Sequence, residues 1–585
     1  MKPPKFSRAK LFAAVALSLL ALACAGPAMT AVAPPFRAAL DRAGLKPGAT
    51  YQTDKLRFEI SFPSSAHAQP ITGRVFVIIS NDPSKEPREE AGSWGDTAPI
   101  FGVDVSQLKP GEAAVIDSTT LGYPPQSLKE IPAGDYHVQA LLNIYTEFHR
   151  SDGHVIWAHM DQWEGQQFNR SPGNLHSEVQ DAHLDPKTGY DVKLNLTKVI
   201  PPIDMPPDTV WLKHVKIQSQ LLTKFWGHPI YLGATVLLPK GYSEHLGAHY
   251  PALYVQDHFG LGPGLPFIDP SAPAGTQGSQ PQRAVDFSNA WTSDHFPRII
   301  AVRFQHPTPY FDDSYAVNSA NNGPYGDALM TELIPYLEEH FRIIPKPYAR
   351  LLFGGSTGGW ESLALQVYHP EFFGGTWTFF PDPIDFRRYQ LTNIYADENA
   401  FEEPGHTWLH AERYMERKSD GQPEVTARDF SRLEAVLGSH GRSGQQLEAW
   451  ESVYGPVGPD GYPKPLWDKL TGKIDHDVAT YMRDHGYDLR YYTEMNWPKI
   501  GSQLAGKIHL YCGDMDNYYL DLAVYLFEDF LKNTKDPAYA GTVEYGRPMM
   551  GHGWMPMSFQ DLVKMMAEEV RRNAPTNEDN GEWNY

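Results

Sequence analysis

The chain has 585 residues, several times the length of a typical domain of about 100 to 200 residues, so we expect more than one compact unit. Hydrophobic residues make up 41% and charged residues 21%, a composition that excludes a disordered or fibrous chain. The 70 Asp and Glu against 50 Lys and Arg give a net charge of -20, which repels phosphate backbones, so no nucleic-acid partner is expected.

Residues 1–25 predict a secretory signal peptide. A basic start precedes the apolar run 11–23, which is too short to cross a bilayer, and no other segment approaches that length. We therefore expect no integral membrane segment and a periplasmic or secreted bacterial protein. The residues before Cys24 also resemble a lipobox, so a lipoprotein anchored at Cys24 is the alternative. Cys512 is the second of two cysteines, a number that excludes a disulfide scaffold.

Residues 50–200 predict an all-β domain. Short runs of alternating polarity, separated by Pro and Gly, occur at 56–62, 73–80, 135–142 and 192–196. This pattern is typical of an antiparallel, immunoglobulin-like sandwich. The proline-rich segment 201–209 then predicts a stiff linker.

Residues 210–574 predict an α/β domain. Strand-like runs occur at 231–239, 250–256, 298–304, 349–355, 374–380, 507–512 and 541–546, with amphipathic helices such as 326–342 between them. This alternation indicates a mostly parallel sheet with helices on both faces.

Residues from about 397 to 497 break this rhythm, because they are polar, mainly helical and rich in Trp and Tyr. We interpret them as a cap inserted at the carboxyl edge of the sheet, where it either shapes a binding pocket or only packs against itself. Residues 575–585 predict a frayed acidic tail.

The sharpest motif is Gly354-Gly355-Ser356-Thr357-Gly358, a G-x-S-x-G pattern between a predicted strand and a predicted helix. Such a tight turn exposes the serine hydroxyl for nucleophilic attack, and only small neighbours let the chain pass so closely. Ser356 is therefore the candidate nucleophile.

A serine hydroxyl needs a base, and in this arrangement the acid and the histidine follow the serine along the chain. His552 is the one histidine after the strand 507–512, and it lies in a loop past the last strand. Asp514 and Asp516 both follow the strand 507–512. We prefer Asp516 as the acid, with Asp514 as the alternative.

The developing oxyanion needs preorganised N–H donors. We expect the backbone N–H of Thr357 to be one donor, and that of His258 or Phe259, in the loop after strand 250–256, to be the second.

The stretch from Lys216 to Ala574 resembles the Putative esterase family of α/β-hydrolases, which includes enterochelin esterases, S-formylglutathione hydrolases, feruloyl esterases and mycolyltransferases. The matching phrases are Tyr250 to Tyr254, Glu332 to Tyr336, the serine motif with Tyr368 to Phe373, and Gly513 and Asp516 followed by Gly551-His552. The resemblance implies an α/β-hydrolase domain with the triad Ser356, Asp516 and His552. An all-β domain ahead of it is similar to the enterochelin-esterase layout. The long insertion and Thr357, where the family often has Met, depart from the family pattern.

Other polar and aromatic residues carry weaker signals. His154, His159, Asp161 and Glu164 lack a metal-binding spacing, so we interpret them as loop residues and expect neither metal nor cofactor. Trp360, Trp554 and Tyr519 adjoin the serine and its partners, and we expect them to bind substrate. Arg303 fits a structural ion pair better than an anion site.

The sequence thus predicts an exported serine esterase that hydrolyses a small-molecule carboxylic ester through an acyl-serine intermediate. An acyltransferase with the same triad and a non-catalytic binding protein are the alternatives. The sequence indicates no particular substrate or oligomeric state.

Overall fold

The computed structural model describes residues 55–92, 97–272, 280–403, 405, 411–576 and 583–585. The predicted signal peptide and Cys24 lie outside the described residues. No helix within the described ranges is long and apolar enough to cross a membrane.

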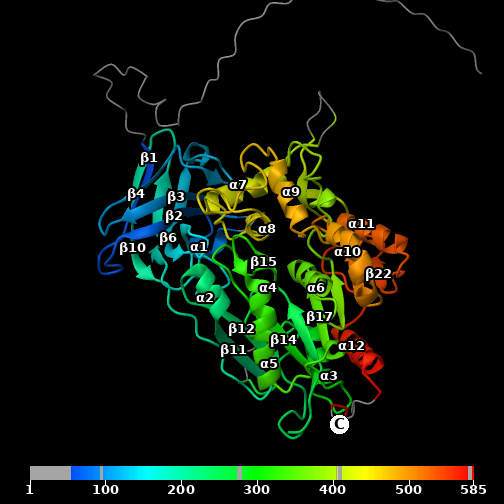
Figure 1. Cartoon of the computed structure of the whole chain (residues 1–585). Coiled ribbons are helices and arrows are strands. Elements are labelled where there is room, and N and C mark those ends of the chain that lie inside the picture. Colours follow the sequence, from blue (N-terminus) through cyan, green and yellow to red (C-terminus); the bar gives the residue numbers. More distant parts are fainter. Residues whose placement is uncertain (1–54, 93–96, 273–279, 404, 406–410, 577–582) are drawn as a thin grey trace, which may run out of the picture. The chain divides into compact units, whose positions relative to one another are not determined.

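The all-β prediction for the N-terminal region agrees with a sheet of ten strands (Figure 1). Eight of them follow the order β4-β1-β10-β8-β6-β2-β3-β5, and β7 and β9 also pair with β6. Strand β1, which lies between β4 and β10, pairs with β10 in parallel, and the other pairs are antiparallel. Alternate side chains of β1 are buried, as the period-two pattern predicts. The immunoglobulin-like topology stays a prediction. The elements are β1 (Leu56–Ser61), β2 (Ile71–Ser80), α1 (Pro87–Glu90), β3 (Ile100–Leu108), β4 (Ala114–Asp117), β5 (Gly122–Tyr123), β6 (Gly134–His149), β7 (Val155–His159), β8 (Leu175–Ser177), β9 (Gln180–Leu184) and β10 (Tyr190–Val199).

A second sheet of eight strands follows, in the order β11-β12-β14-β13-β17-β18-β21-β22. The β11–β12 and β12–β14 pairs are antiparallel, and all later neighbours are parallel. This is the sheet of an α/β-hydrolase. Each of the seven predicted strands has a counterpart in it, and β11 is additional. The strands are β11 (Leu212–Ser219), β12 (Ile230–Leu237), β13 (Ala252–Gln256), β14 (Ile300–Gln305), β17 (Arg350–Gly355), β18 (Gly375–Phe379), β21 (Ile508–Gly513) and β22 (Thr542–Gly546).

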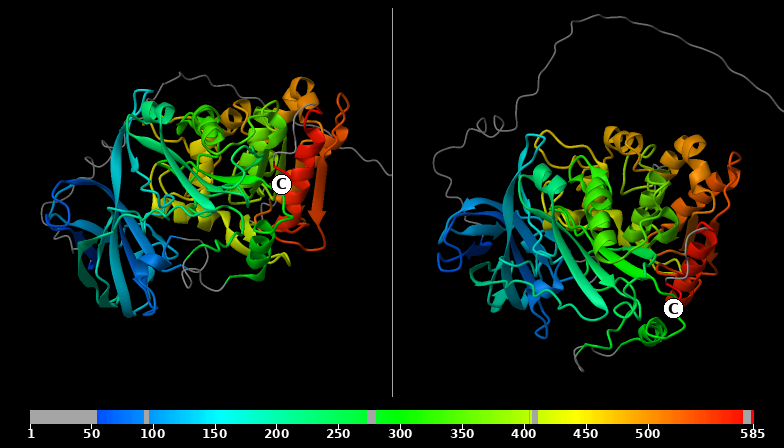
Figure 2. Two further views of the ribbon diagram at one scale, coloured as in Figure 1. Left: turned by 90° about the horizontal axis from the view of Figure 1, so that it is seen from below. Right: turned by 60° about the horizontal axis from the view of Figure 1, so that its bottom comes forward.

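Helices lie on both sides of this sheet (Figure 2). Helices α3 and α12 contribute to one hydrophobic cluster, and α6, α10 and α11 contribute to another. Along β21, Tyr511 joins the first cluster whereas Leu510 and Cys512 join the second, because successive side chains of a strand point to opposite faces. The predicted helix 326–342 consists of α4, a π-helical turn over Leu329–Leu333 and α5. The helices are α2 (Gln220–Trp226), α3 (Gln282–Trp291), α4 (Tyr325–Ala328), α5 (Ile334–His340), α6 (Thr357–Tyr368), α11 (Asp521–Asn533) and α12 (Phe559–Asn573), and the short strands β15 (Asn318–Ser319) and β16 (Gly323–Pro324) precede α4.

In its described residues, the insertion between β18 and β21 combines a hairpin with four α-helices and a short 3-10 helix at Phe386–Arg388. It contains β19 (Tyr414–Arg417), β20 (Pro423–Thr426), α7 (Ala427–Leu437), α8 (Gln446–Tyr454), α9 (His476–Asp484) and α10 (Leu489–Leu504). A buried ion cluster stabilises it: the Lys469 ammonium lies 3.2 Å from Glu434 and 3.0 Å from Glu451. Of the aromatic residues that predicted a cap, Tyr454, Trp467 and Trp497 are buried, and Trp408 lies outside the described residues.

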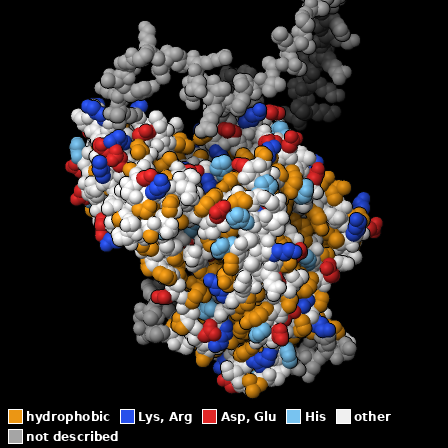
Figure 3. Space-filling model, turned by 60° about the vertical axis from the view of Figure 1, so that its left-hand side comes forward, with side chains coloured by type: hydrophobic (Ala, Val, Ile, Leu, Met, Phe, Trp, Pro, Cys, Tyr) orange, Lys and Arg blue, Asp and Glu red, His pale blue; other side chains and the backbone are white. Residues whose placement is uncertain are grey.

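The end of the chain differs from the predicted frayed tail. Trp583 is only 1% exposed, and the Tyr585 hydroxyl hydrogen-bonds to that of Tyr250 at 2.9 Å. Packing of these two aromatic rings against the protein outweighs the acidic character that suggested fraying. On the face shown in Figure 3, the described Lys and Arg side chains are interspersed with acidic and apolar ones.

Candidate active site

Ser356 occupies a strained turn between β17 and α6. Its backbone has φ 57° and ψ -123°, a conformation that non-glycine residues rarely adopt. A Cβ on Gly354 would lie 1.9 Å from the carbonyl oxygen of Gly358, and a Cβ on Gly358 would lie 2.0 Å from that of Gln256. Both positions therefore require glycine, as the predicted nucleophile turn does.

His552 lies next to one of the two candidate acids. The Nδ1 atom of His552 is 2.8 Å from Oδ2 of Asp516, a carboxylate that is 0% exposed. Oδ1 of Asp516 accepts the backbone N–H of Tyr518 at 2.9 Å, which fixes the carboxylate. Asp514 instead accepts the backbone N–H of Met550 at 3.1 Å and shapes the adjoining turn.

The ring of His552 is also held from its sides. Its centroid lies 4.6 Å from that of Phe380 and 4.9 Å from that of Tyr518, with both contacts edge-to-face. The backbone N–H of His552 donates to Asn517 at 2.8 Å. The imidazole is thus fixed in orientation, as a general base must be.

Ser356 and His552 line the same cavity of about 300 Å³. Within the part of the chain that the structure describes, the Ser356 hydroxyl makes no hydrogen bond, and such contacts often tighten only when substrate binds. The insertion supplies one wall of the cavity, and loops at the carboxyl edge of the sheet supply the other. The lining residues are His258, Ser356, Asp382, Gln390, Met415, Glu416, Phe430, Gln446, Leu447, Trp450, Tyr518, Leu520 and His552.

The predicted oxyanion donors differ in availability. Thr357 is the first residue of α6, so no carbonyl of the helix accepts its backbone N–H. The backbone N–H of His258 donates to the Asp257 carboxylate at 2.9 Å. The Phe259 ring packs edge-to-face on Trp163 at 5.4 Å, which points its side chain toward the loop after β7.

The three predicted substrate-binding aromatic residues do not line the cavity. Trp360 is 0% exposed and packs against Tyr315 and Tyr454 at 5.6 and 5.1 Å between ring centroids. Trp554 lies over Gly546, where a Cβ would approach its ring to 2.4 Å. The Tyr519 ring lies 4.4 Å from the guanidinium of Arg417. Their positions close to the triad in sequence suggested substrate contact, but their rings face the protein core or the insertion.

Sequence reasoning missed the most heavily hydrogen-bonded carboxylate of the cavity, Asp382. Its Oδ2 accepts from the hydroxyls of Tyr315 at 2.8 Å and Thr357 at 3.0 Å, and from the side chains of Gln446 and Trp450 at 3.1 and 3.2 Å. Burial raises the pKa of Asp382, and these donors partly offset that effect. A signal existed, because Asp382 directly follows a predicted strand at the carboxyl edge.

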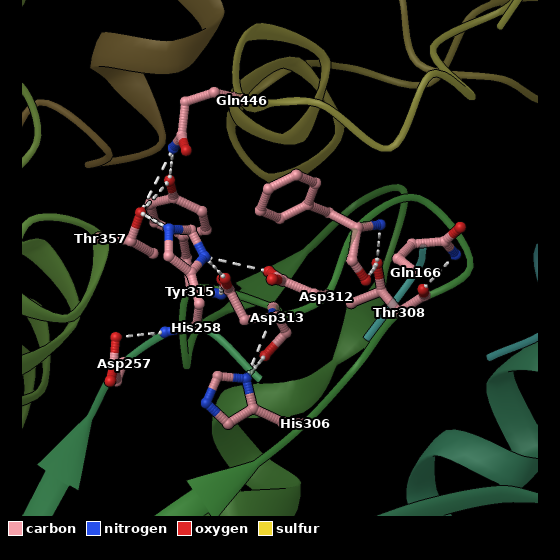
Figure 4. Close-up of polar contacts among 12 residues, drawn as sticks. Gln166, Asp257, His258, His306, Thr308, Asp312, Asp313, Tyr315, Thr357 and Gln446 are labelled. Carbon is pink, nitrogen blue, oxygen red and sulfur yellow. Dashed lines mark hydrogen bonds and ion pairs between the residues drawn. The ribbon is translucent and has the colours of Figure 1, made fainter. Parts of the chain in front are cut away.

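The second missed feature is a cluster of one histidine, His258, and two carboxylates, Asp312 and Asp313, near Thr357, shown in Figure 4. Nδ1 of His258 lies 3.1 Å from Asp312 and 3.2 Å from Asp313. Burial alone would lower the pKa of His258, but the two carboxylates outweigh it and hold that pKa well above its usual value. The Nε2 atom of His258 lies 3.4 Å from the Thr357 hydroxyl.

The loop cluster with His159 is satisfied within itself. Nδ1 of His159 contacts Asn143 at 2.9 Å and Nε2 contacts Glu164, while Asp161 accepts two backbone N–H groups. His154 lies apart, 3.2 Å from Asp152. Arg303 pairs with Asp257 at 2.9 Å, a structural role that agrees with the expectation.

Comparison with known proteins gives a match to one family model, described as Putative esterase, over residues 231–418. No curated protein matches. Similar solved structures include an S-formylglutathione hydrolase from Agrobacterium tumefaciens, with 15% identity over 63% of this chain and 99% of the other and a TM-score of 0.32. They also include a fluorophosphonate-binding serine hydrolase of Staphylococcus aureus, with 14% identity over 61% of this chain and 98% of the other and a TM-score of 0.30. A third is a ferulic acid esterase from Anaeromyces mucronatus, with 13% identity over 61% of this chain and 92% of the other and a TM-score of 0.27.

The family match confirms the resemblance inferred from the sequence and supports ester hydrolysis. The matched residues, 231–418, include the Ser356 turn.

Proposed function

We propose that the protein is an exported serine esterase that hydrolyses a small carboxylic ester through an acyl-serine intermediate. The observation that carries this proposal is the strained turn of Ser356, which shares a cavity with the Asp516-paired His552. The family match over residues 231–418 supports the ester specificity.

The mechanism follows from the positions of these groups. Oγ of Ser356 bonds to the ester carbonyl carbon while its proton passes to His552. Nδ1 faces Asp516, so Nε2 is the ring nitrogen that takes the proton, and Asp516 stabilises the resulting imidazolium. The tetrahedral intermediate expels the alcohol, which takes the proton from His552. Water then repeats these steps on the acyl-serine and releases the acid.

His258 also faces the cavity, but it is unsuited to be the base. Its raised pKa keeps the imidazole protonated at neutral pH, and a protonated imidazole cannot accept the serine proton. His552 is paired with one carboxylate rather than two, and we therefore assign it the role of base.

The wall supplied by the insertion suits an ester with an apolar group. Met415, Phe430, Leu447 and Trp450 come from the insertion and line the cavity together with His258 and Asp382. We propose that this wall selects the acyl or alcohol group of the substrate.

The hairpin of the insertion also braces the loop that carries the triad acid. The Arg417 guanidinium donates to the Asp516 carbonyl at 3.0 Å and pairs with Asp521 at 2.9 Å, and Asn517 donates to the Arg417 carbonyl at 2.7 Å. Deleting the insertion would therefore remove support for Asp516, so its role in specificity is better tested by single substitutions.

We propose export on the basis of residues 1–25, with a lipoprotein anchored at Cys24 as the alternative. The remaining cysteine, Cys512, is buried, and burial raises its thiol pKa well above the usual value. Such a thiol is unreactive in an oxidising compartment.

The test is labelling of the full chain with a fluorophosphonate probe. Wild type should be labelled and Ser356→Ala should not. Ser362→Ala is the matched control, because Ser362 is a buried serine of the same helix and its loss should leave labelling intact. Equal labelling of wild type and Ser356→Ala would reject the assignment. Product analysis with and without an added alcohol then separates hydrolysis from acyl transfer.

A further inference from the structure

The loops beside the serine bring together an unusual set of metal-binding side chains. His258 follows β13, Asp312 and Asp313 follow the neighbouring strand β14, and one ligand atom from each lies within 4.8 Å of the others. Among the described residues, this is the one group of three such side chains with that spacing.

The spacing of the ligand atoms fits a metal ion. With metal–ligand bonds of about 2.1 Å and angles between about 90° and 110°, neighbouring ligand atoms lie about 3.0 to 3.4 Å apart. Nδ1 of His258 lies 3.1 Å from Asp312 Oδ1 and 3.2 Å from Asp313 Oδ2. An ion could therefore replace the Nδ1 proton with little movement of these side chains.

Two carboxyl groups, those of Asp312 and Asp313, face the single imidazole of His258. Buried carboxylates of this kind are paired or bind cations.

The surroundings also suit a metal site. Asp313 Oδ1 accepts the Tyr315 backbone N–H at 3.0 Å, and Nε2 of His258 lies 3.4 Å from the Thr357 hydroxyl, so the outer contacts that orient metal ligands are present. The His258 side chain is 38% exposed and lines the cavity, which gives an ion a path to enter.

We propose that His258, Asp312 and Asp313 bind one divalent transition-metal ion, such as Zn²⁺ or Mn²⁺, that ties the loops after β13 and β14 together. One imidazole with two carboxylates suits these ions better than Ca²⁺ or Mg²⁺, which prefer oxygen ligands alone. This site departs from the sequence-based expectation of no metal, and it does not depend on the proposed esterase function.

The experiment measures metal binding to the full chain. Protein stripped with EDTA is dialysed against ZnCl₂ or MnCl₂, the bound metal is counted by mass spectrometry, and affinity is measured by calorimetry. Wild type should bind one ion per chain, and Asp312→Asn and Asp313→Asn should each weaken binding at least tenfold. Binding to Ser356→Ala should equal that of wild type, because the site does not use the serine.

Controls keep the test decisive. Asp312→Asn and Asp313→Asn preserve the shape of the side chains, and circular dichroism of the metal-free variants reports whether they fold. Asp181→Asn removes the carboxylate of an exposed pair with His137, at 2.7 Å, and should leave binding unchanged. The proposal is overturned if wild type binds no stoichiometric ion, if the two cluster variants bind as wild type does, or if Ca²⁺ binds more tightly than either transition metal.

Discussion

Two histidines face the candidate cavity, and their carboxylate partners differ. His552 has one, Asp516 at 2.8 Å, whereas His258 has two, Asp312 and Asp313 at 3.1 and 3.2 Å. A single buried carboxylate orients an imidazole and stabilises its charge only while that charge exists. Two carboxylates favour the charged imidazole, or a bound metal ion, over the neutral ring. The number of carboxylate partners therefore distinguishes His552, which transfers protons, from His258, which does not.

The largest expected effect separates the two histidines in catalysis. His552→Gln should lower kcat for an aryl acetate by about 10⁴-fold or more, as loss of a triad member does. His258→Gln should cost no more than about 10²-fold, because it removes no proton transfer. Steady-state kinetics on both variants would contradict these roles if His258→Gln lowered kcat more than His552→Gln did.

The next effect concerns the acid. Asp516→Asn should lower kcat by about 10⁴-fold, because the amide no longer stabilises the imidazolium that forms at His552. Asp514→Asn is the matched control, two residues away and hydrogen-bonded to a backbone N–H of the same turn, and it should stay within about tenfold of wild type. If Asp514→Asn lowered kcat more than Asp516→Asn did, Asp514 would be the triad acid.

A smaller effect concerns the wall from the insertion. Phe430→Ala should change the ratio of kcat/KM between an aryl-acyl ester and an acetyl ester by about 10- to 100-fold, because an apolar contact contributes about 1 to 3 kcal/mol. Fluorophosphonate labelling of Ser356 should persist. Phe401→Ala offers a control, since Phe401 is a buried residue of the insertion outside the lining. If Phe430→Ala left this ratio of kcat/KM unchanged, the cavity wall from the insertion would not select the substrate.

The smallest effect is on stability and follows from the raised pKa of His258. Below the unfolded-state pKa of about 6.5 the imidazole is charged in both states, and its interaction with Asp312 and Asp313 contributes fully. As pH rises through the higher folded-state pKa, that contribution is lost. Urea unfolding in EDTA should therefore show a larger loss of stability in His258→Gln at about pH 6 than at about pH 9. An equal loss of stability at both pH values would contradict a charged His258 imidazole in the folded protein.

Much of this organisation could be predicted from the sequence. Apolar runs located the strands of the second sheet, and the glycines around Ser356 marked the turn because no side chain fits there. His552 followed from its place after the last strand. These features depend on local patterns.

The remaining features depend on contacts between distant segments. Asp382 meets Gln446 across 64 positions, and His258 meets Asp312 across 54, so no local pattern indicates either contact. Trp360 was misjudged for the same reason: its position in the first turn of α6 is visible in the sequence, but the tertiary packing that turns its ring toward Tyr454 is not.

The central claim is that an acyl group passes through Ser356. Full-length protein is mixed with an activated aryl ester, quenched in acid within one turnover, digested, and searched for acylated peptides by tandem mass spectrometry. The account predicts an acyl adduct on Ser356 that accumulates in wild type as the phenol is released and is absent from Ser356→Ala. An adduct on another residue, or release of the phenol with no adduct in either protein, would contradict it.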